Sequence, residues 1–305
     1  MTASLPGTFD PASFPTDRFV LDCRGQPLDC RPGAPHETGA HLMGILNVTP
    51  DSFSDGGQFT AVDDALARTA KMLDAGASII DIGGESTRPG ADPVSAQEER
   101  DRVLPVVSAI AERFPEALLS IDTYKPDVAA AALEAGAHIV NDVTGLRHHP
   151  ETAAVAADHG APMILMHSVN EPGALTETPA YDDVLDAVVA SVRRSIAIAD
   201  EAGVAHVAVD PGFGFGKTVA QNLRLVNRVD RLLALERPVL VGVSRKSTIG
   251  AVLGTDDAPR PVDARLHGSL GATAVALLRG ATLVRTHDVA ATADMLRTMR
   301  ATLHA

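Results

Sequence analysis

The segment that decides the fold is Ala75-Gly76-Ala77-Ser78-Ile79-Ile80-Asp81-Ile82-Gly83-Gly84-Glu85. Its first glycine follows a helical stretch, at a position where a left-handed backbone costs a side chain least. A continuous apolar run comes next, which is typical of a parallel strand buried on both faces. Polar residues end the run. The segment therefore predicts, in order, a helix end, a buried strand and a polar strand tip.

The same order recurs along the chain from residue 42 onward. Seven further apolar runs are Leu42 to Val48, Leu118 to Asp122, Ile139-Val140, Met163 to Met166, Val207 to Val209, Val239 to Val243 and Leu283-Val284. Helical patterns lie between them, as where Val184, Val188 and Val192 recur at every fourth position. Eight βα units over about 260 residues predict a (βα)8 TIM barrel. A doubly wound open sheet is the alternative, and it would rarely need eight such even units.

The first 40 residues differ from this pattern, because they are rich in Pro and Gly and lack helical periodicity. Phe19-Val20-Leu21 and Pro27-Leu28, joined across Arg24-Gly25, could form a small hairpin. We therefore expect a short N-terminal extension over residues 1–40 and a catalytic barrel domain over residues 41–305. The N-terminus also lacks the basic and apolar segments of a secretory signal.

Composition limits the classes of partner. The 305 residues carry 26 Lys and Arg against 39 Asp and Glu, a formal net charge of −13, and only 3% are aromatic, with no Trp. Such a chain repels phosphate backbones and offers few rings for base stacking, so nucleic acid is not expected as a partner. No apolar run reaches the ~18 residues of a membrane span. The two cysteines, Cys23 and Cys30, form no metal motif, and a reduced, cytoplasmic protein is the simplest interpretation.

Polar residues gather at the predicted carboxyl ends of the strands, where barrels of this kind hold their active sites. These strand tips carry Asn47, Glu85, Asp122, Asn141, Asp142, His167, Asp210, Ser244-Arg245-Lys246 and Arg285. A ring this polar exceeds what capping requires. It predicts a convergent site at one end of the barrel.

The residue types at these tips favour one kind of ligand. A carboxylate such as Asp122 or Asp210 can accept two parallel N–H bonds from a 2-aminopyrimidine edge. An amide, Asn141, and an ammonium, Lys246, can address ring nitrogens and a carbonyl. Arg285 follows the last strand, where such barrels often bind phosphate. From chemistry alone, the sequence predicts an enzyme that binds a polar heterocycle and an anionic, phosphorylated group.

Three further features bear on the mechanism. The glycine-rich stretch Gly212 to Thr218 resembles a phosphate-binding Walker A loop, but Pro211 stands where that motif requires glycine, so the match fails. The sequence has no Cys nucleophile motif, no Ser-His-Asp signature and no zinc-binding HExxH motif, so covalent catalysis is not expected. Two long loops, Thr49 to Thr60 and Gly83 to Ser95, are of the length that often forms lids.

Five motifs, in order, identify a family resemblance. Met43 to Gly57 and Asp81 to Gly90 closely resemble the first two signatures of the dihydropteroate synthases, a pterin-binding barrel family. Asp210 to Lys217, Ser244 to Ser247 and Arg285 to Val289 resemble its later motifs. The resemblance spans roughly residues 42 to 290 and leaves out the N-terminal extension.

The resemblance implies a reaction and a set of roles. The amine of p-aminobenzoate displaces pyrophosphate from 6-hydroxymethyl-7,8-dihydropterin pyrophosphate, and 7,8-dihydropteroate is formed. The implied pterin-binding residues are Asp122, Asn141, Met166, Asp210 and Lys246. Those implied for pyrophosphate are Asn47, Thr87, Arg285 and His287, with Mg²⁺ as cofactor beside Asn47. Those implied for p-aminobenzoate are Arg88, Pro89, Phe215, Arg245 and Ser247, and the implied catalytic residues are Arg88, Lys246, Arg285 and His287.

The family's chemistry also accounts for the missing nucleophile, since an activated leaving group needs alignment and charge stabilisation rather than covalent attachment. Two alternatives remain at this point: a methyltetrahydrofolate-dependent methyltransferase on the same barrel, and a non-catalytic pterin-binding homologue. The resemblance further implies a homodimer that pairs through exposed apolar helix faces near the C-terminal end.

Overall fold

Eight parallel strands form one closed sheet in the computed structural model, which describes residues 9–34, 40–48, 57–86, 92–168, 180–255, 258–303 and 305. The strands are β3 (His41–Asn47), β4 (Ile79–Gly83), β5 (Leu118–Asp122), β6 (Ile139–Asp142), β7 (Met163–Met166), β8 (Val207–Asp210), β9 (Leu240–Val241) and β10 (Leu283–Thr286). Their order is β8-β7-β6-β5-β4-β3-β10-β9, and a parallel bridge between Val209 and Val239 joins the two ends. The predicted (βα)8 barrel is confirmed.

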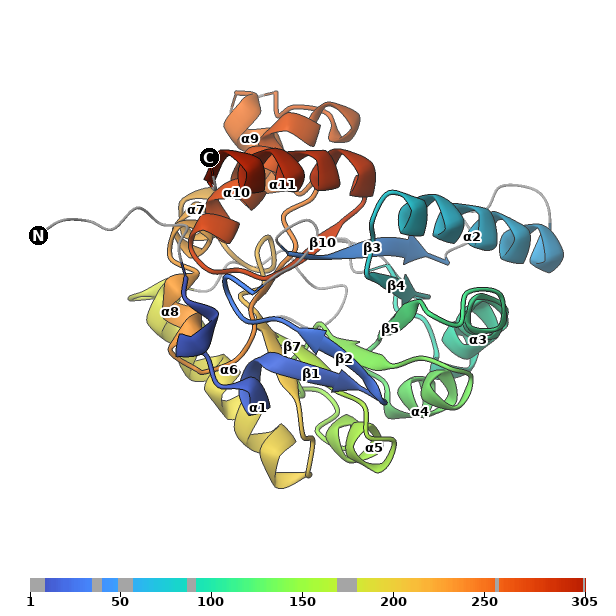
Figure 1. Cartoon of the computed structure of the whole chain (residues 1–305). Helices are drawn as coiled ribbons and strands as arrows, with labels where there is room; N and C mark the ends of the chain where they lie inside the picture. The colour runs from blue at the N-terminus through green and yellow to red at the C-terminus, as the bar shows by residue number, and fades with distance from the viewer. Residues whose placement is uncertain are drawn as a thin grey trace, which may run out of the picture.

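Helices surround the sheet on its outer side (Figure 1). They are α2 (Gly57–Asp74), α3 (Ala96–Arg113), α4 (Pro126–Glu134), α5 (Thr152–Asp158), α6 (Val184–Glu201), α7 (Val219–Asn227), α8 (Asp230–Leu233), α9 (Ser247–Leu253), α10 (Leu266–Leu278) and α11 (Val289–Leu303), with a 3-10 turn, η3 (Val262–Ala264). Val188 and Val192 of α6 are buried, as their recurrence at every fourth position predicts. The apolar stripes of such helices cover the outer face of the barrel.

The glycines that end the helices behave as the sequence indicates. A glycine with positive φ lies shortly before each of five strands, β4, β6, β7, β8 and β10. These glycines are Gly76 (103°), Gly136 (114°), Gly160 (61°), Gly203 (88°) and Gly280 (100°). This backbone conformation is open to glycine at little cost and reverses the chain into the next strand.

Two details differ from the sequence-based prediction. β9 is only Leu240–Val241, shorter than the run from Val239 to Val243, because the backbone leaves the ladder for the turn before α9. The predicted first loop, Thr49 to Thr60, is also too long, since α2 already begins at Gly57. The remainder of that loop, residues 49–56, lies outside the described residues.

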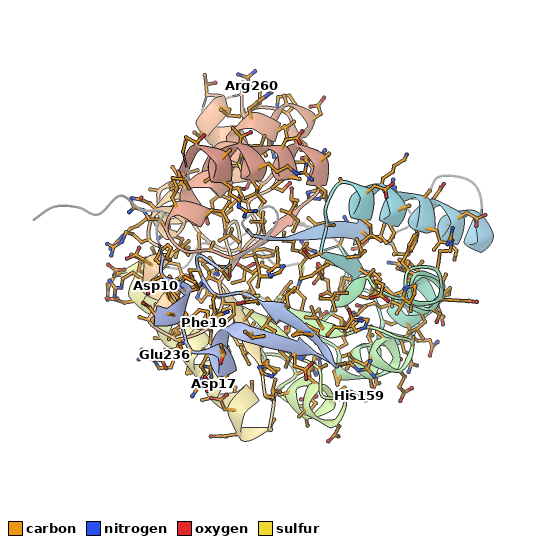
Figure 2. The ribbon with its side chains drawn as sticks, viewed as in Figure 1. Asp10, Asp17, Phe19, His159, Glu236 and Arg260 are labelled. Carbon is orange, nitrogen blue, oxygen red and sulfur yellow. The ribbon has the colours of Figure 1, made fainter. Side chains whose placement is uncertain are left out.

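The N-terminal segment closes one end of the barrel. After the short η1 (Pro11–Ser13) and α1 (Thr16–Phe19), strands β1 (Val20–Cys23) and β2 (Gln26–Asp29) pair antiparallel, and Figure 1 shows them lying across the barrel end. Phe19, labelled in Figure 2, is buried where α1 meets β1. The inward side chains Leu21, Cys23, Leu28 and Cys30 form one buried cluster with the barrel interior. The hairpin therefore plugs the end opposite the strand tips.

The barrel interior is built in layers, because side chains alternate between its two faces. The layer that meets the hairpin takes one apolar residue from each strand: Met43, Ile79, Leu118, Ile139, Ile164, Ala208, Leu240 and Leu283. Two positions further along each chain segment, toward the strand tips, stand Ile45, Asp81, Ser120, Asn141, Met166, Asp210, Gly242 and Arg285. We call these the lower layer and the upper layer. The upper layer is mostly polar and forms the floor of the candidate site.

Candidate active site

Arg285 lies at the centre of the upper layer, between two carboxylates. Its Nε donates to Asp81 Oδ2 and its Nη2 to Asp122 Oδ2, each at 2.6 Å. Asp81 is fully buried at the middle of β4 and also accepts from Asn141 Nδ2 at 3.3 Å. Gly242 faces the same cluster, since a Cβ placed there would lie 3.7 Å from Arg285 Cβ and 3.9 Å from Asp210 Oδ2. Four strands thus meet in one hydrogen-bonded cluster.

The cluster shifts the pKa of both partners. Burial raises the pKa of Asp122 to about 7, an effect that the positive charge of Arg285 opposes and the negative charge of Asp81 reinforces. Burial lowers the pKa of Arg285, but Asp81 and Asp122 raise it by more, so its pKa lies above the ordinary value. The site therefore holds a permanent cation beside a carboxyl group that is poised to gain or lose a proton near neutrality.

Asp210, at the end of β8, and Lys246, just before α9, form a second charged group of the same site. Burial raises the pKa of Asp210, while the charge of Lys246 acts against that rise. Burial lowers the pKa of Lys246 to about 8, and Asp210 opposes this fall. The Lys246 ammonium donates to the backbone oxygen of Phe213 and lies 4.2 Å from the centroid of the Phe215 ring. A cation–π contact of this kind contributes about 0.5–2 kcal/mol.

Two further predicted residues, His287 after β10 and Arg245 after β9, are held by contacts between these two segments. His287 contacts Ser244 at two atoms: its backbone N–H donates to Ser244 Oγ at 3.2 Å, and its Nδ1 lies 3.2 Å from the same oxygen. His287 also lines an open pocket of about 330 Å³ between α2 and α11, together with Lys71 and Met72. Arg245 pairs with Asp288 through two hydrogen bonds, one of them Nε to Oδ2 at 2.9 Å.

The structure brings most of the predicted site residues together at this end of the barrel. Met166 is buried in the upper layer, Asn47 ends β3 beside Gly83 of β4, and Ser247 is exposed at the first position of α9. Thr87, Arg88 and Pro89 lie outside the described residues. Their predicted roles stay predictions.

Three strand-tip residues serve the scaffold instead. The Asp142 carboxylate accepts from the backbone N–H groups of Thr144 and Leu146, at 2.7 and 2.8 Å, and fixes the turn after β6. Glu85 accepts from Lys125 Nζ at 2.7 Å, and the same ammonium binds Glu99 at 2.5 Å.

His167 is the third, and its ring is buried. Burial lowers the pKa of His167 to about 3, so the imidazole stays neutral. Its ring centroid lies 6.2 Å from that of Tyr181.

Several residues of the site go beyond what the sequence predicts. Asp81 stands within an apolar run, and an acid in such a run is itself a signal of a buried polar partner. Ser244 and Asp288 lie within recognisable motifs, but nothing in the sequence pairs them with His287 and Arg245. Lys217 is the lysine of the Walker-like stretch, and the structure buries it against the loop that follows β8.

Metal clusters and membrane spans are both missing from the described part of the molecule. Across the described ranges, no group of three or more His, Cys, Asp or Glu side chains is placed to hold a metal ion. None of the described helices is long and apolar enough to cross a membrane.

A barrel whose strand ends combine carboxylates with cations is typical of enzymes that bind a polar heterocycle next to an anionic group. Residues 43–287 match the model of the pterin-binding enzyme family. The dihydropteroate synthase of Escherichia coli K12 is 46% identical over 267 residues, which cover 87% of this chain and 92% of that enzyme.

Solved structures agree with this match. The Xanthomonas albilineans dihydropteroate synthase with 4-aminobenzoic acid has a TM-score of 0.84 and 41% identity, covering 94% of this chain and 99% of its own. The Yersinia pestis enzyme in a sulfonamide complex has a TM-score of 0.83 and 42% identity, covering 94% and 100%. The chain belongs to the dihydropteroate synthases, transferases of the pterinylmethyl group, and the methyltransferase alternative is set aside.

Proposed function

We propose that the upper layer and the strand tips above it condense p-aminobenzoate with 6-hydroxymethyl-7,8-dihydropterin pyrophosphate. The observation that carries the proposal is the placement of Arg285 between Asp81 and Asp122, in the same site as Asp210 and Lys246. This arrangement offers carboxylate acceptors for a heterocycle and cations for a leaving pyrophosphate. Both lie at the end of the barrel that the hairpin leaves open.

The pterin is assigned to the polar half of the upper layer. Asp122 and Asp210 come from β5 and β8 and can each accept N–H groups at the ring edge. Asn141, which donates to Asp81, offers its remaining amide donor and acceptor capacity to the ring. Lys246 supplies an ammonium donor, and the buried thioether of Met166 supplies an apolar contact. Few aromatic side chains are needed for such edge recognition.

Pyrophosphate is assigned to the cationic side of the same cluster. Arg285 presents a guanidinium that suits forked contacts with phosphate, and His287 lies two residues before the start of α11. Asn47 and Thr87 complete this proposed subsite. Arg285 is the residue whose charge offsets the charge that builds on the leaving group.

The donor set fits a Mg²⁺ ion that is held mainly by the substrate. Mg²⁺ typically takes one or two protein oxygens, several waters and substrate phosphates. Asn47 provides one amide oxygen at the end of β3, and the described residues lack a cluster that would cage the ion alone. When bound there, Mg²⁺ neutralises pyrophosphate charge. This cofactor assignment rests on Asn47 and on the resemblance.

p-Aminobenzoate is assigned to the rim formed by Phe215, Arg245 and Ser247, with Arg88 and Pro89 from the second loop. Phe215 offers an apolar ring, and the exposed Ser247 offers a hydroxyl and a helix N-terminal N–H to the carboxylate. In the reaction the amine nitrogen bonds to the methylene carbon while the carbon–oxygen bond to pyrophosphate breaks. The nitrogen then releases one proton to solvent. Because the leaving group is already activated, the residues align and stabilise charge without a covalent intermediate.

A homodimer is part of the proposal, and exposed apolar side chains support it. Val219 and Leu223 of α7 and Val275 of α10 are each 39% exposed, and Val252 of α9 is 52% exposed. α10, Leu-His-Gly-Ser-Leu-Gly-Ala-Thr-Ala-Val-Ala-Leu-Leu, carries no Asp, Glu, Lys or Arg. Such a face suits a second copy of the chain. Val275→Glu is expected to convert the dimer to monomer in sedimentation experiments, and an unchanged mass would refute this interface.

Two smaller assignments concern location and inhibition. The enzyme is proposed to act in the cytoplasm, which the free thiols of Cys23 and Cys30 support. It is also proposed as a sulfonamide target, because the similar Yersinia pestis enzyme was solved with such a drug. Competition between a sulfonamide and p-aminobenzoate in initial-rate measurements tests the second assignment.

The decisive experiment is turnover by the purified protein. With Mg²⁺ and both substrates, we expect equal amounts of 7,8-dihydropteroate and pyrophosphate. Asp210→Asn should weaken pterin binding about 10²-fold, since a charge-assisted bidentate contact is lost. Asp294→Asn, at an exposed position on α11, is the matched control and should change nothing. Pterin binding without product would favour the non-catalytic homologue.

A further inference from the structure

The loop that follows β8 is held in shape by a buried lysine. Lys217 is 8% exposed, and its Nζ donates to the backbone oxygens of Gly212 at 2.8 Å, Phe215 at 2.9 Å and His167 at 3.5 Å. Among the described residues it forms no ion pair, so three carbonyl dipoles solvate the ammonium. Burying an ammonium is costly unless such partners are fixed in place. The side chain therefore ties both ends of the loop to the end of β7.

A buried amide on α7 holds the same loop from the other side. Asn222 is 1% exposed, accepts from Gly214 N at 2.8 Å and donates to the backbone oxygen of Lys217 at 3.2 Å. Its Nδ2 also donates to Thr248 Oγ1 at 2.8 Å. Thr248 stands directly after Lys246 and Ser247 at the start of α9. One amide thus connects the loop to the segment that carries two proposed substrate-binding residues.

Glycines allow the loop to approach its neighbours closely. A Cβ at Gly212 would lie 1.9 Å from the His167 backbone oxygen, and φ there is +69°. A Cβ at Gly214 would lie 2.8 Å from Lys246 Cδ, with φ at +83°. The loop consequently lies directly against Lys246. Its Phe213 oxygen accepts from Lys246 Nζ, and the Phe215 ring lies under the same ammonium.

We propose that Lys217 and Asn222 are positioning residues that hold the Phe215 ring against Lys246, in place for p-aminobenzoate. Neither side chain needs to touch a substrate. The Walker-like appearance of this stretch then has a different cause: the lysine binds the loop's own carbonyl oxygens, and the glycines serve loop packing. The inference rests on the proposed function, which places p-aminobenzoate beside Phe215.

Steady-state kinetics with Lys217→Met tests the proposal. We expect the KM for p-aminobenzoate to rise about 10-fold or more, because a displacement of about 1 Å can cost up to 10²-fold in rate. The affinity for the dihydropterin pyrophosphate, measured by calorimetry without p-aminobenzoate, should change by a smaller factor than this KM, because Asp122 and Asn141 are held by Arg285 and Asp81 and not by the loop. Thr248→Val, which removes only the cross-connection to α9, should show a smaller change in the same direction.

A spectroscopic measurement separates this inference from the proposed function. The chain has no Trp, so Phe215→Trp places a single Trp, whose emission can be excited selectively, at the loop. Adding Lys217→Met should shift its emission to the red and make it more accessible to acrylamide. Arg237→Met is the control, since it removes another buried cation, 6% exposed, at the far end of the barrel. Arg237 donates to a backbone oxygen at 3.0 Å and also pairs with Asp200 at 3.5 Å, so its loss should destabilise the fold without touching the loop.

Each outcome decides the proposal. If the wild-type protein makes no product, the proposed function fails, while the Trp measurement still decides whether Lys217 orders the loop. If Lys217→Met weakens both substrates equally, or leaves the Trp emission unchanged, Lys217 only stabilises the fold. A purely stabilising role would also follow if Arg237→Met produced the same KM change.

Discussion

The lower and upper layers of the barrel interior lie two residues apart on the same strands, yet they have opposite character. Each lower-layer side chain is apolar and at most 6% exposed. The upper layer contains Asp81, Asn141, Asp210 and Arg285. In each of their strands, the residue two positions earlier is an apolar member of the lower layer. The hairpin β1–β2 covers the first layer, and the second opens toward the strand tips.

The two layers show how a protein interior tolerates a buried polar site. Each buried Leu or Ile of the lower layer contributes about 1.5–3 kcal/mol of hydrophobic stabilisation. The upper layer gains less from burial, and its charges are acceptable only because Arg285 and Asp81 satisfy one another. Ser120 Oγ, also in this layer, is buried without a hydrogen-bond partner among the described atoms. On each strand, the residue that stabilises the barrel and the residue that lines the site are therefore only two positions apart.

Arg285→Met should have the largest effect. It removes the cation that two carboxylates share, so Asp81 would be left buried and unpaired, and transition-state charge would lose its partner. We expect kcat/KM to fall about 10²–10³-fold or more, and the free energy of unfolding to fall by about 3–5 kcal/mol. Initial rates and urea titrations measure both. A variant with near-normal turnover would contradict the role of the upper layer.

Leu283→Ala, two residues earlier on the same strand β10, is the counterpart in the lower layer. Leu283 is fully buried, and its truncation leaves a cavity beneath the hairpin. We expect a loss of about 2–5 kcal/mol in unfolding free energy, with kcat close to normal at temperatures where the variant remains folded. If instead kcat falls as steeply as in Arg285→Met, the two layers are not functionally separate.

The sequence predicts the lower layer better than the upper one. Apolar runs after glycines such as Gly76 and Gly136 fix strand number, order and the barrel, because burial and backbone freedom are local properties. The parallel direction of the strands also predicts that Asp122, Asn141, Asp210, Lys246 and Arg285 lie at one end of the barrel, as the structure has them.

Pairings across the barrel are harder to predict. Arg285 and Asp81 are 204 residues apart in the chain, and Arg245 meets Asp288 only after the barrel closes. Nothing local tells a tip residue that binds substrate from one such as Asp142 that fixes a turn. Those distinctions come from tertiary contacts, and they decide which polar residues stay available to a ligand.

The pH dependence of pterin binding should come from the upper layer and its rim. Because the pKa of Asp122 is about 7 and that of Lys246 about 8, both groups are charged only in a narrow interval between them. Below pH 7 the affinity for the dihydropterin pyrophosphate should fall about tenfold per pH unit, because Asp122 becomes protonated. Above pH 8 the affinity should also fall, because Lys246 loses its charge. Asp122→Asn should abolish the acid limb in calorimetric titrations.

The same group acts on folding with the opposite sign. The pKa of Asp122 is raised in the folded state above its ordinary value of 3.8, so the folded protein binds more protons between pH 3.8 and about 7. Its contribution to stability is fully present below pH 3.8 and is lost as pH rises through about 7. Binding should therefore improve over the interval in which this contribution to stability declines. Parallel rather than opposed trends would show that another group dominates.

The smallest expected effect lies at the plugged end, where Arg24 ties the hairpin to the barrel. Its Nη1 donates to the backbone oxygens of Leu133, at 2.7 Å, and Ala137, at 2.6 Å, which flank the turn between α4 and β6. The side chain lies at the surface, so Arg24→Gln should cost about 1 kcal/mol of unfolding free energy. Turnover should be unchanged, because the lower layer separates Arg24 from the site. A fall in kcat without a loss of stability would mean that the hairpin influences the strand tips, and the separation of the two layers would then be incomplete.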